Sequence, residues 1–254
     1  MPRVPFDIIT AGVDLSSQID RTALCLVEWS DSRAIVTALA LGVDDDTIAG
    51  LMATVGKLGI DVPLGWPTTF ADAVAQHSRD GSWPADYLHA DNSAFRFRRT
   101  DLWVWRTLKT RPPLSVSSDR IALPAMRAAA LFSRRVPRVA LDGSGVLVEV
   151  YPAAALRRWG LPSQQYKGKD YSDARRVLVE RFLEETAEWL TVRSDGVELC
   201  LWSDDALDAL IAALVARAAS VALVEPVPKE DHAFALREGW IAVPCTGSLS
   251  LLAL

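Results

Sequence analysis

The sequence predicts an α/β domain that begins with an antiparallel meander and carries an insertion. Three apolar runs, separated by short polar breaks, open the chain at residues 8–15, 21–29 and 34–41. Breaks of this length are typical of hairpin loops, so consecutive runs predict antiparallel strands. A capped amphipathic helix and a fourth apolar run follow. Because half of the 254 residues are hydrophobic, the chain can bury one full core, and we expect a single domain over residues 1–254.

The first apolar run ends in a carboxylate and two hydroxyls, at Asp14, Ser16 and Ser17. An apolar, β-branched segment closed by small polar residues is typical of a buried strand with its functional end outward. Asp14 can be a turn former, a metal ligand or a group that faces phosphate. The Ser16 hydroxyl can cap a hairpin or contact a phosphate.

The helix and the fourth strand come next. Three aspartates at residues 44–46 precede apolar residues at helical spacing, which predicts an acidic N-terminal cap. A metal cluster is the alternative interpretation. Residues 55–62 then read as a strand that carries a second carboxylate, Asp61, at its end. Prolines follow, so the chain must leave the sheet through a rigid turn.

Residues 68–138 behave as an insertion of helices and loops, with a helix expected at 124–135. Its second part is strongly basic. Residues 96–138 contain 11 Lys and Arg against only Asp101 and Asp119, a balance of +9, whereas the rest of the chain carries 16 basic and 30 acidic residues. This asymmetry predicts an anion-binding face with nucleic acid as the expected partner. A set of solvated helical faces is the alternative.

Aromatic residues alternate with arginines at the start of this basic segment. Such interleaving can stack bases and bind phosphates. The same aromatics can equally form a core strand with their rings inward, and we favour a structural role for them. They are Phe95, Phe97, Trp103 and Trp105.

A polar stretch at 142–145 separates two further apolar runs, residues 138–141 and 146–151, and predicts a hairpin. The second run carries Glu149, and Pro152 then opens a helix. A carboxylate in an apolar strand is costly to bury unless it is paired, coordinated or protonated, so Glu149 is a candidate site residue. An exposed position on an edge strand is the alternative.

The last third of the chain predicts a long amphipathic helix at 172–189 and then a second helix capped by Ser203 or Asp204. On this second helix Asp205 and Asp208 are spaced i, i+3, so they project from one face. Asp205 suits the positive end of the helix whether or not it has a function. Asp208 lies one turn further in, among apolar residues, and that position calls for another explanation.

Cysteine usage and hydropathy indicate the compartment. The three cysteines are far apart, lack CxxC spacing and lie in apolar settings, so we expect free buried thiols in a reducing compartment. The start of the chain has no apolar signal core, and its one long apolar stretch is interrupted by Asp208 and Arg217. We therefore expect a cytoplasmic protein without a membrane partner. The sequence predicts no oligomeric state.

Five acids are placed at strand ends, within a strand or on a helix face; they are Asp14, Asp61, Glu149, Asp205 and Asp208. Hard divalent cations take oxygen ligands, so Mg²⁺ or Mn²⁺ is the expected cofactor. Without a cation, acids within ~4 to 6 Å of one another raise each other's pKa. Two ions about 4 Å apart can activate a water and stabilise a departing oxygen in phosphodiester hydrolysis.

Five short motifs occur in order along most of the chain. They are Gly12-Val13-Asp14-Leu15-Ser16, Gly59-Ile60-Asp61-Val62-Pro63-Leu64-Gly65, Arg98-Arg99-Thr100-Asp101, Glu149-Val150-Tyr151-Pro152 and Asp205-Ala206-Leu207-Asp208-Ala209. Over about residues 8–224 they resemble the domain-of-unknown-function 429 family, described as predicted nucleases with a ribonuclease H-like fold. The resemblance implies a mixed central sheet flanked by helices, in which Asp61 ends a strand parallel to the first.

The resemblance also implies roles for single residues. It places the metal centre at Asp14, Asp61 and one or both of Asp205 and Asp208, with Glu149 nearby. A second polar group, expected to clamp a substrate phosphate or to act as a lid, consists of Arg98, Thr100 and Asp101.

Two further positions can be compared with the family pattern. Lys167 matches the lysine of a Tyr-Lys pair often seen after the Tyr-Pro motif, and we expect it at the substrate. Asp204 is a departure, because the family often has a histidine there; if that histidine contributes to activity, the chemistry here is altered or lost.

The leading hypothesis is a metal-dependent nuclease or related phosphodiester hydrolase with a two-metal site held by Asp14, Asp61 and Asp208. An actin-like nucleotide-binding phosphotransferase or ATPase is the first alternative, since that fold also opens with a Gly-x-Asp-x-Ser strand and a meander. No second glycine-rich phosphate loop is evident, however. A non-catalytic protein that binds nucleic acid or another anion through the basic insertion is the second alternative.

Overall fold

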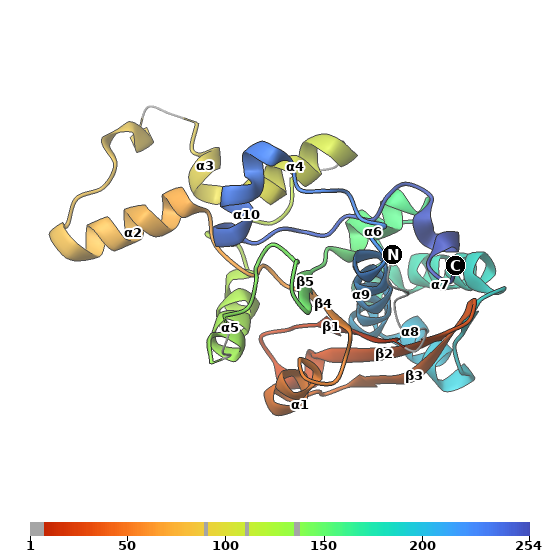
Figure 1. Cartoon of the computed structure of the whole chain (residues 1–254). Helices are drawn as coiled ribbons and strands as arrows, with labels where there is room; N and C mark the ends of the chain where they lie inside the picture. Colours follow the sequence, from red (N-terminus) through yellow and green to blue (C-terminus); the bar gives the residue numbers. More distant parts are fainter. Residues whose placement is uncertain (1–7, 89–90, 110–111, 135–137) are drawn as a thin grey trace, which may run out of the picture.

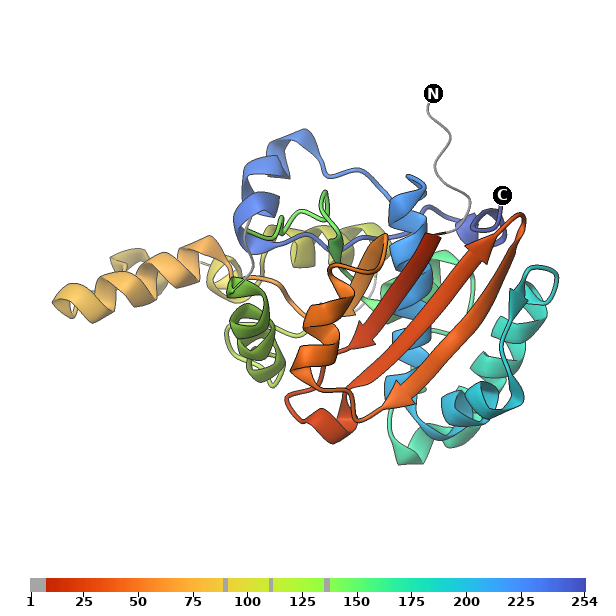
Figure 2. The ribbon, with the colours of Figure 1, turned by 60° about the horizontal axis from the view of Figure 1, so that its bottom comes forward.

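The computed structural model describes residues 8–88, 91–109, 112–134 and 138–254. At its centre is a six-stranded sheet in the order β5-β4-β1-β2-β3-β6, with helices packed on both faces (Figures 1 and 2). The strands are β1 (Ile8–Asp14), β2 (Ala23–Ser30), β3 (Arg33–Leu41), β4 (Lys57–Asp61), β5 (Leu147–Glu149) and β6 (Leu190–Thr191).

The pairing of the strands confirms the predicted mixed α/β architecture. Strands β1, β2 and β3 form the antiparallel meander. Strand β4 lies parallel to β1, and β5 lies parallel to β4. The short β6, which the sequence pattern did not reveal, is parallel to β3 at the other edge. The sheet therefore combines an antiparallel half with a parallel half, and β1 is the strand where the two halves meet.

One face of the sheet is covered by a long central helix, α9 (Asp204–Ser220), which contacts β1, β2 and β4 (Figure 2). Ser203 caps it by accepting a hydrogen bond from the Ala206 amide at 3.2 Å, as the sequence predicted. Further helices pack around α9 on this side; they are α6 (Pro152–Arg158), α7 (Ser172–Thr186) and α8 (Ser194–Trp202). Helix α9 is thus enclosed between the sheet and an outer helical layer.

The opposite face is covered by α1 (Asp45–Leu51) and α5 (Ala122–Ser133), which bury a second apolar cluster against β1 and β4. Asp44 caps α1 by accepting a hydrogen bond from the Thr47 amide at 2.8 Å. The acidic run is thus the start of a helix, as predicted, because a side-chain oxygen at the N-cap satisfies a free amide of the first turn.

Two glycines allow α9 to lie directly on the sheet. A Cβ atom at Gly12 of β1 would lie 2.0 Å from the Ala209 carbonyl oxygen, and one at Gly59 of β4 would lie 2.3 Å from that of Ala212. Glycine is therefore required at both positions by the close approach of the two backbones. Gly12 and Gly59 are direct register partners, so together they form a surface without side chains on which the helix packs.

The insertion is mainly helical, as expected. It contains α2 (Thr68–Asp80), the short helical turn η2 (Ala85–Leu88), α3 (Ser93–Arg96), α4 (Arg99–Leu108) and α5. Helix α2 extends away from the body of the molecule in both views, whereas α4 packs against α6 and against the late helix α10 (His232–Glu238) (Figures 1 and 2). Within the insertion, α5 contributes to the core and α2 protrudes.

The core strand considered for the aromatic stretch at 95–106 is wrong. Residues 95–96 end α3 and residues 99–106 belong to α4, whose start Asp101 caps by accepting a hydrogen bond from the Arg98 amide at 2.9 Å. The structural role of the aromatics is confirmed for Phe95 and Phe97, which are buried. Trp105, in contrast, keeps 37% of its surface exposed.

The hairpin predicted around residues 142–145 is also wrong. Residues 138–141 form no strand, and β5 runs parallel to β4. The cause is a partner far away in the chain: the Lys57 ammonium donates to the carbonyls of Gly143 and Gly145, both at 2.6 Å. These contacts hold the turn against the start of β4, and the following residues then continue alongside that strand.

Other expectations can be placed as well. The cysteines are free thiols, with Cys25 and Cys200 buried and Cys245 partly buried. Among the described residues, no helix is both long and apolar enough to cross a membrane. The start of the chain at residues 1–7 lies outside the described residues, and so do Arg111 and Arg135 of the basic segment.

Candidate metal centre

Register and strand alternation bring the first two acids together. Asp14 and Asp61 are direct partners at the ends of the parallel strands β1 and β4. Side chains on a strand alternate between faces, so Asp14 projects on the same side as Gly12, and Asp61 on the same side as Gly59. That side is the face covered by α9. Both carboxylates therefore point toward the helix.

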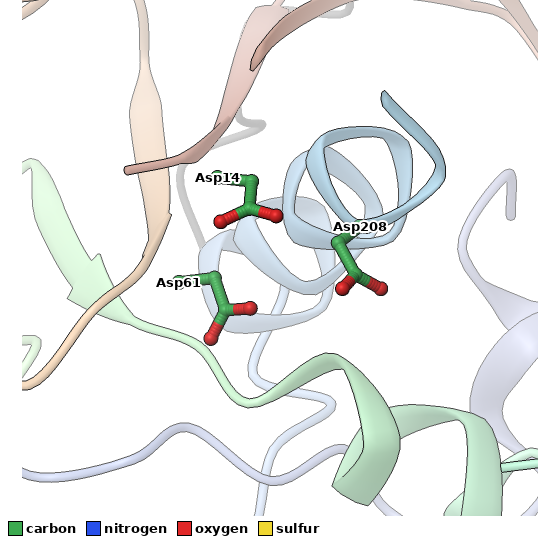
Figure 3. Close-up of side chains that lie close together, drawn as sticks. All are labelled: Asp14, Asp61 and Asp208. Carbon is green, nitrogen blue, oxygen red and sulfur yellow. The ribbon is translucent and has the colours of Figure 1, made fainter. Parts of the chain in front are cut away.

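Asp208 completes the group from the helix side. It lies one turn into α9 and is fully buried. One carboxylate oxygen from each of Asp14, Asp61 and Asp208 lies within 4.8 Å of the other two, and Figure 3 shows the three side chains turned toward one another. The structure thus brings together the three residues expected to hold metal, in a group that could hold an ion.

A lysine and a tyrosine from the loop before α7 reach the same group. The Lys167 ammonium lies 2.5 Å from Asp208 Oδ2 and 3.7 Å from Asp61 Oδ2. The Tyr166 hydroxyl donates to Asp208 Oδ1 at 2.9 Å. Asp208 Oδ2 is buried, and the Lys167 ammonium is its close charged partner. The centre therefore already contains one positive charge supplied by the chain.

Burial and mutual repulsion change the titration of this group. Burial raises the pKa of Asp61 to about 7, and Asp208 adds to the rise while Lys167 opposes it. Burial, followed by the charge of Asp61, raises the pKa of Asp14 well above its usual value. Burial also raises the pKa of Asp208. The three carboxylates therefore need a positive charge among them if all are to ionise near neutral pH.

The same acids act on the lysine in the opposite direction. Partial desolvation of its ammonium beside the buried acids would by itself lower the pKa of Lys167, but Asp208 and then Tyr166 and Asp61 raise it well above its usual value. An ammonium beside carboxylates is stabilised in its charged form. Lys167 is thus a permanent cation at this centre.

Asp205, the other helix acid, lies beside the group but is bound elsewhere. The Arg21 guanidinium donates to both of its oxygens, with Nη2 3.0 Å from Oδ1 and Nε 3.3 Å from Oδ2. Asp204 lies 3.8 Å from Arg175 Nη1. The first turn of α9 therefore pairs its outer acids with arginines and leaves Asp208 to face the strand ends.

Glu149 is directed away from the three aspartates. Its register partner on β4 is Ile60, so its side chain projects on the opposite face of the sheet from Asp61. There Arg98 donates two hydrogen bonds, at 2.6 Å to Oε1 and 2.7 Å to Oε2, and the Leu64 amide donates a third at 3.0 Å. The strand acid is thus paired and buried, which is the first of the possibilities that its sequence context allowed.

The group expected to bind substrate phosphate is internal. Arg98, Thr100 and Asp101 are each 2% exposed or less. Asp101 accepts from the Arg98 guanidinium at 2.9 Å, and the Thr100 hydroxyl accepts from the Ile241 amide at 2.9 Å. These three residues tie α4 to β5 and to the C-terminal segment. They serve as an anchor of the insertion and offer no free group to a ligand.

Ser16 lies in the loop after β1, where its hydroxyl accepts from the Gln18 amide at 3.2 Å. This contact matches the turn-capping interpretation. Arg127 of α5 donates to the Ser16 carbonyl at 2.6 Å and to the Thr22 hydroxyl at 2.7 Å. The loop beside Asp14 is therefore held in place by the insertion.

Three site residues were missed from the sequence: Tyr166 as a partner of Asp208, Arg21 as the partner of Asp205, and Arg175. Arg175 is buried and donates to the carbonyls of Tyr166, at 2.9 Å, and Trp202, at 3.1 Å. It thereby fixes the loop that carries Lys167 to the start of α9. A local signal for the centre was nevertheless present, because Gly-x-Asp occurs in both central strands.

Comparison with known proteins gives one match. A family model described as "Protein of unknown function (DUF429)" matches residues 12–233. No curated protein and no solved structure matches the chain. The matched residues include Asp14, Asp61 and Asp208, together with the insertion.

Proposed function

The chain belongs to the DUF429 family of proteins of unknown function, and from this premise we propose that it is a divalent-cation-dependent hydrolase of phosphodiester bonds, a nuclease. The observation that carries the proposal is the convergence of Asp14, Asp61 and Asp208 within 4.8 Å. The carboxylates come from two adjacent strand ends and a facing helix, so rigid elements hold them in place. The expected ion is Mg²⁺ or Mn²⁺.

The donor set fits such an ion. All three side chains offer carboxylate oxygens, which hard divalent cations prefer over nitrogen or sulfur. No histidine or cysteine belongs to the group. The buried Asp208 Oδ2 has the Lys167 ammonium as its close charged partner. A cation at this position would compensate charge that burial otherwise disfavours.

The residues around the ion have separate tasks. A bound Mg²⁺ or Mn²⁺ supplies Lewis acidity and lowers the pKa of a coordinated water. Asp14, Asp61 and Asp208 would hold the ion, and Tyr166 orients Asp208 through its hydrogen bond. Lys167 has its ammonium at the edge of the group with 47% of its side chain exposed, so it can meet an incoming phosphate oxygen.

The charge distribution supports nucleic acid as the substrate. The basic segment 96–138 contrasts with the acidic remainder of the chain. Part of it is used internally, since Arg98 is buried and Arg127 pairs with Asp45. Arg96, Arg106 and Arg120 are exposed and remain available to phosphates.

The proposal is tested by incubating purified protein with labelled single- and double-stranded DNA and RNA, with Mg²⁺, Mn²⁺ or EDTA. We expect cation-dependent cleavage that Asp14→Asn and Asp208→Asn abolish and that Asp46→Asn, an exposed aspartate on α1, preserves. The proposal is rejected if no nucleic acid is cleaved and Mn²⁺ binding does not depend on Asp14.

The same preparation separates the alternatives. A non-catalytic binder would keep its affinity for nucleic acid in Asp14→Asn and show no turnover in the wild type. Thermal stabilisation by ATP with Mg²⁺, absent with oligonucleotides, would instead indicate the actin-like phosphotransferase.

A further inference from the structure

We propose that this centre holds one divalent ion and that Lys167 takes the place of a second; the inference rests on the proposed function. The sequence suggested a two-metal site. Such a site needs enough free carboxylates to balance two divalent charges. Of the five acids that the sequence predicted for the site, Asp205 and Glu149 are paired with arginines, which leaves Asp14, Asp61 and Asp208 to bind an ion.

Asp205 is the first acid that is not available to a second ion. Both of its oxygens accept hydrogen bonds from the Arg21 guanidinium. A bidentate guanidinium balances the charge of a carboxylate and fits its geometry. Arg21 belongs to the short helical turn η1 (Ile19–Arg21) that follows β1. The pair therefore links the loop after Asp14 to the start of α9, beside the three aspartates.

Glu149 is the second acid that is not available to a second ion. It is buried, receives two hydrogen bonds from Arg98, and lies on the opposite face of the sheet from Asp61. A second ion on the α9 side of the sheet cannot reach it without unpairing a buried guanidinium. Glu149 is thus a structural anion that belongs to the anchor of α4.

The remaining charges match one ion. Asp14, Asp61 and Asp208 together carry −3 when ionised, and Lys167 contributes +1, so the group has a net charge of −2. One Mg²⁺ or Mn²⁺ neutralises it, whereas two would leave an excess of +2 in a largely buried group. Arg175 holds the Lys167 loop through the carbonyls on either side of this residue, Tyr166 at 2.9 Å and Gly168 at 3.1 Å. The ammonium is therefore a fixed part of the centre.

The inference gives Lys167 a defined role in the reaction. In a two-metal centre the second ion stabilises charge on the departing oxygen. Here the ammonium lies 2.5 Å from Asp208 Oδ2 and 3.7 Å from Asp61 Oδ2, and its side chain is 47% exposed, so it can donate a hydrogen bond to a phosphate oxygen as negative charge develops. No second ion is then required.

The test counts the metal. Wild type, Lys167→Met and Lys169→Met are dialysed against a series of Mn²⁺ concentrations, and bound manganese per chain is measured by mass spectrometry. Lys169 is the matched control, since it lies two residues away, is exposed and makes no contact with the three aspartates. Calorimetry on the same samples gives the affinity.

We expect wild type and Lys169→Met to bind one Mn²⁺ per chain. Lys167→Met should bind its ion roughly tenfold more tightly or more, because a unit positive charge a few ångströms from the ion opposes binding even under full water screening. Two ions per chain in the wild type, or an unchanged affinity in a folded Lys167→Met, would overturn the inference and leave a metal-dependent nuclease intact. Absence of any bound ion would reject the proposed function itself.

Discussion

At the scale of single residues, the molecule compensates buried charge in two different ways. On one face of the sheet, Arg98 pairs with both Glu149 and Asp101 through hydrogen bonds of 2.6–2.9 Å. On the other face, the group of three aspartates has a single ammonium, that of Lys167, which contacts Asp208 and Asp61. The first arrangement is closed and structural. When every carboxylate is ionised, the second keeps the larger excess of negative charge, −2 against −1, and its carboxylates are not held by a guanidinium; both features distinguish a candidate metal centre from a buried ion-pair group.

The raised pKa of Asp61 predicts how stability depends on pH. The folded carboxyl has a pKa of about 7 against a usual 3.8, so between these values the folded protein binds more protons than the unfolded chain. The free energy of unfolding of the metal-free protein should therefore fall as pH rises from about 4 to 7, by up to about 1.4 kcal/mol per pH unit from this group. Urea unfolding across this range measures the slope.

Asp61→Asn should flatten that slope, and Asp46→Asn should leave it unchanged. Added Mn²⁺ should raise the melting temperature more at pH 8 than at pH 5.5, because binding must displace protons at the lower pH. An Asp61→Asn variant with the wild-type slope would show that this carboxyl titrates normally.

Removing Arg98 should strongly destabilise the fold. In Arg98→Met, two buried carboxylates lose their partner, and such losses typically cost about 3–5 kcal/mol. Arg193→Met is the control, since Arg193 pairs with Asp195 at the surface, with 73% and 69% of the two side chains exposed, and should cost less than about 1 kcal/mol. Equal unfolding free energies for the two variants would contradict the role given to Arg98.

At the scale of elements, the sequence predicted what local signals control. The meander, the caps of α1 and α9 and the strand ending at Asp61 each rest on neighbouring residues. The hairpin at 142–145 failed because Lys57, more than 80 residues away, holds that turn. The helix α4 was missed because a capping aspartate outweighed the alternation of aromatic residues.

The site follows the same rule. Asp14, Asp61 and Asp208 were predicted from their positions in two strands and a helix. The partners of the other acids were not, since Arg21 lies 184 residues from Asp205 and Arg98 lies 51 residues from Glu149. A sequence pattern cannot show which of several acids a distant arginine will neutralise.

The close contact between α9 and the glycines of the sheet predicts the effect of a larger residue at Gly59. In Gly59→Ala, the new Cβ would lie 2.3 Å from the Ala212 carbonyl oxygen, so the helix must shift. We expect a loss of roughly 1–3 kcal/mol or more and weaker Mn²⁺ binding, since Asp208 moves with α9. Denaturant unfolding and calorimetry measure the two quantities.

Gly50→Ala provides the comparison, because Gly50 lies in α1 with open space around its Cβ position. This variant should be neutral or stabilised by up to about 1 kcal/mol. If Gly59→Ala behaved in the same way, α9 would not be positioned by close contact with β4.

At the scale of the whole molecule, an acidic body carries a basic segment. The net charge of −5 conceals +9 between residues 96 and 138. A protein with this distribution should bind polyanions through one region and repel them elsewhere. The insertion supports the Asp14 loop through Arg127, and under the proposed function it is also the face expected to bind nucleic acid.

Neutralising exposed arginines of this segment should weaken binding of nucleic acid. The test uses the Asp208→Asn background, which is expected not to cleave. There, Arg106→Gln with Arg120→Gln should lower the affinity for nucleic acid several-fold. The slope of log affinity against log salt concentration should become shallower by up to about 2, one for each lost phosphate contact. The matched pair Arg33→Gln with Arg181→Gln, exposed and outside the segment, should change neither. Fluorescence anisotropy at several salt concentrations measures both. Equal effects of the two pairs of substitutions would show that the basic segment is not the face that binds nucleic acid.

The central claim is that Asp14, Asp61 and Asp208 hold a divalent cation. The most direct measurement is a crystal structure of the protein soaked in Mn²⁺, with the ion located by its anomalous scattering. The account predicts a peak at about 2.1 Å from oxygens of these three residues, with Glu149 still bound to Arg98. A manganese-soaked crystal without a peak there, or with the ion bound by other residues, would contradict it.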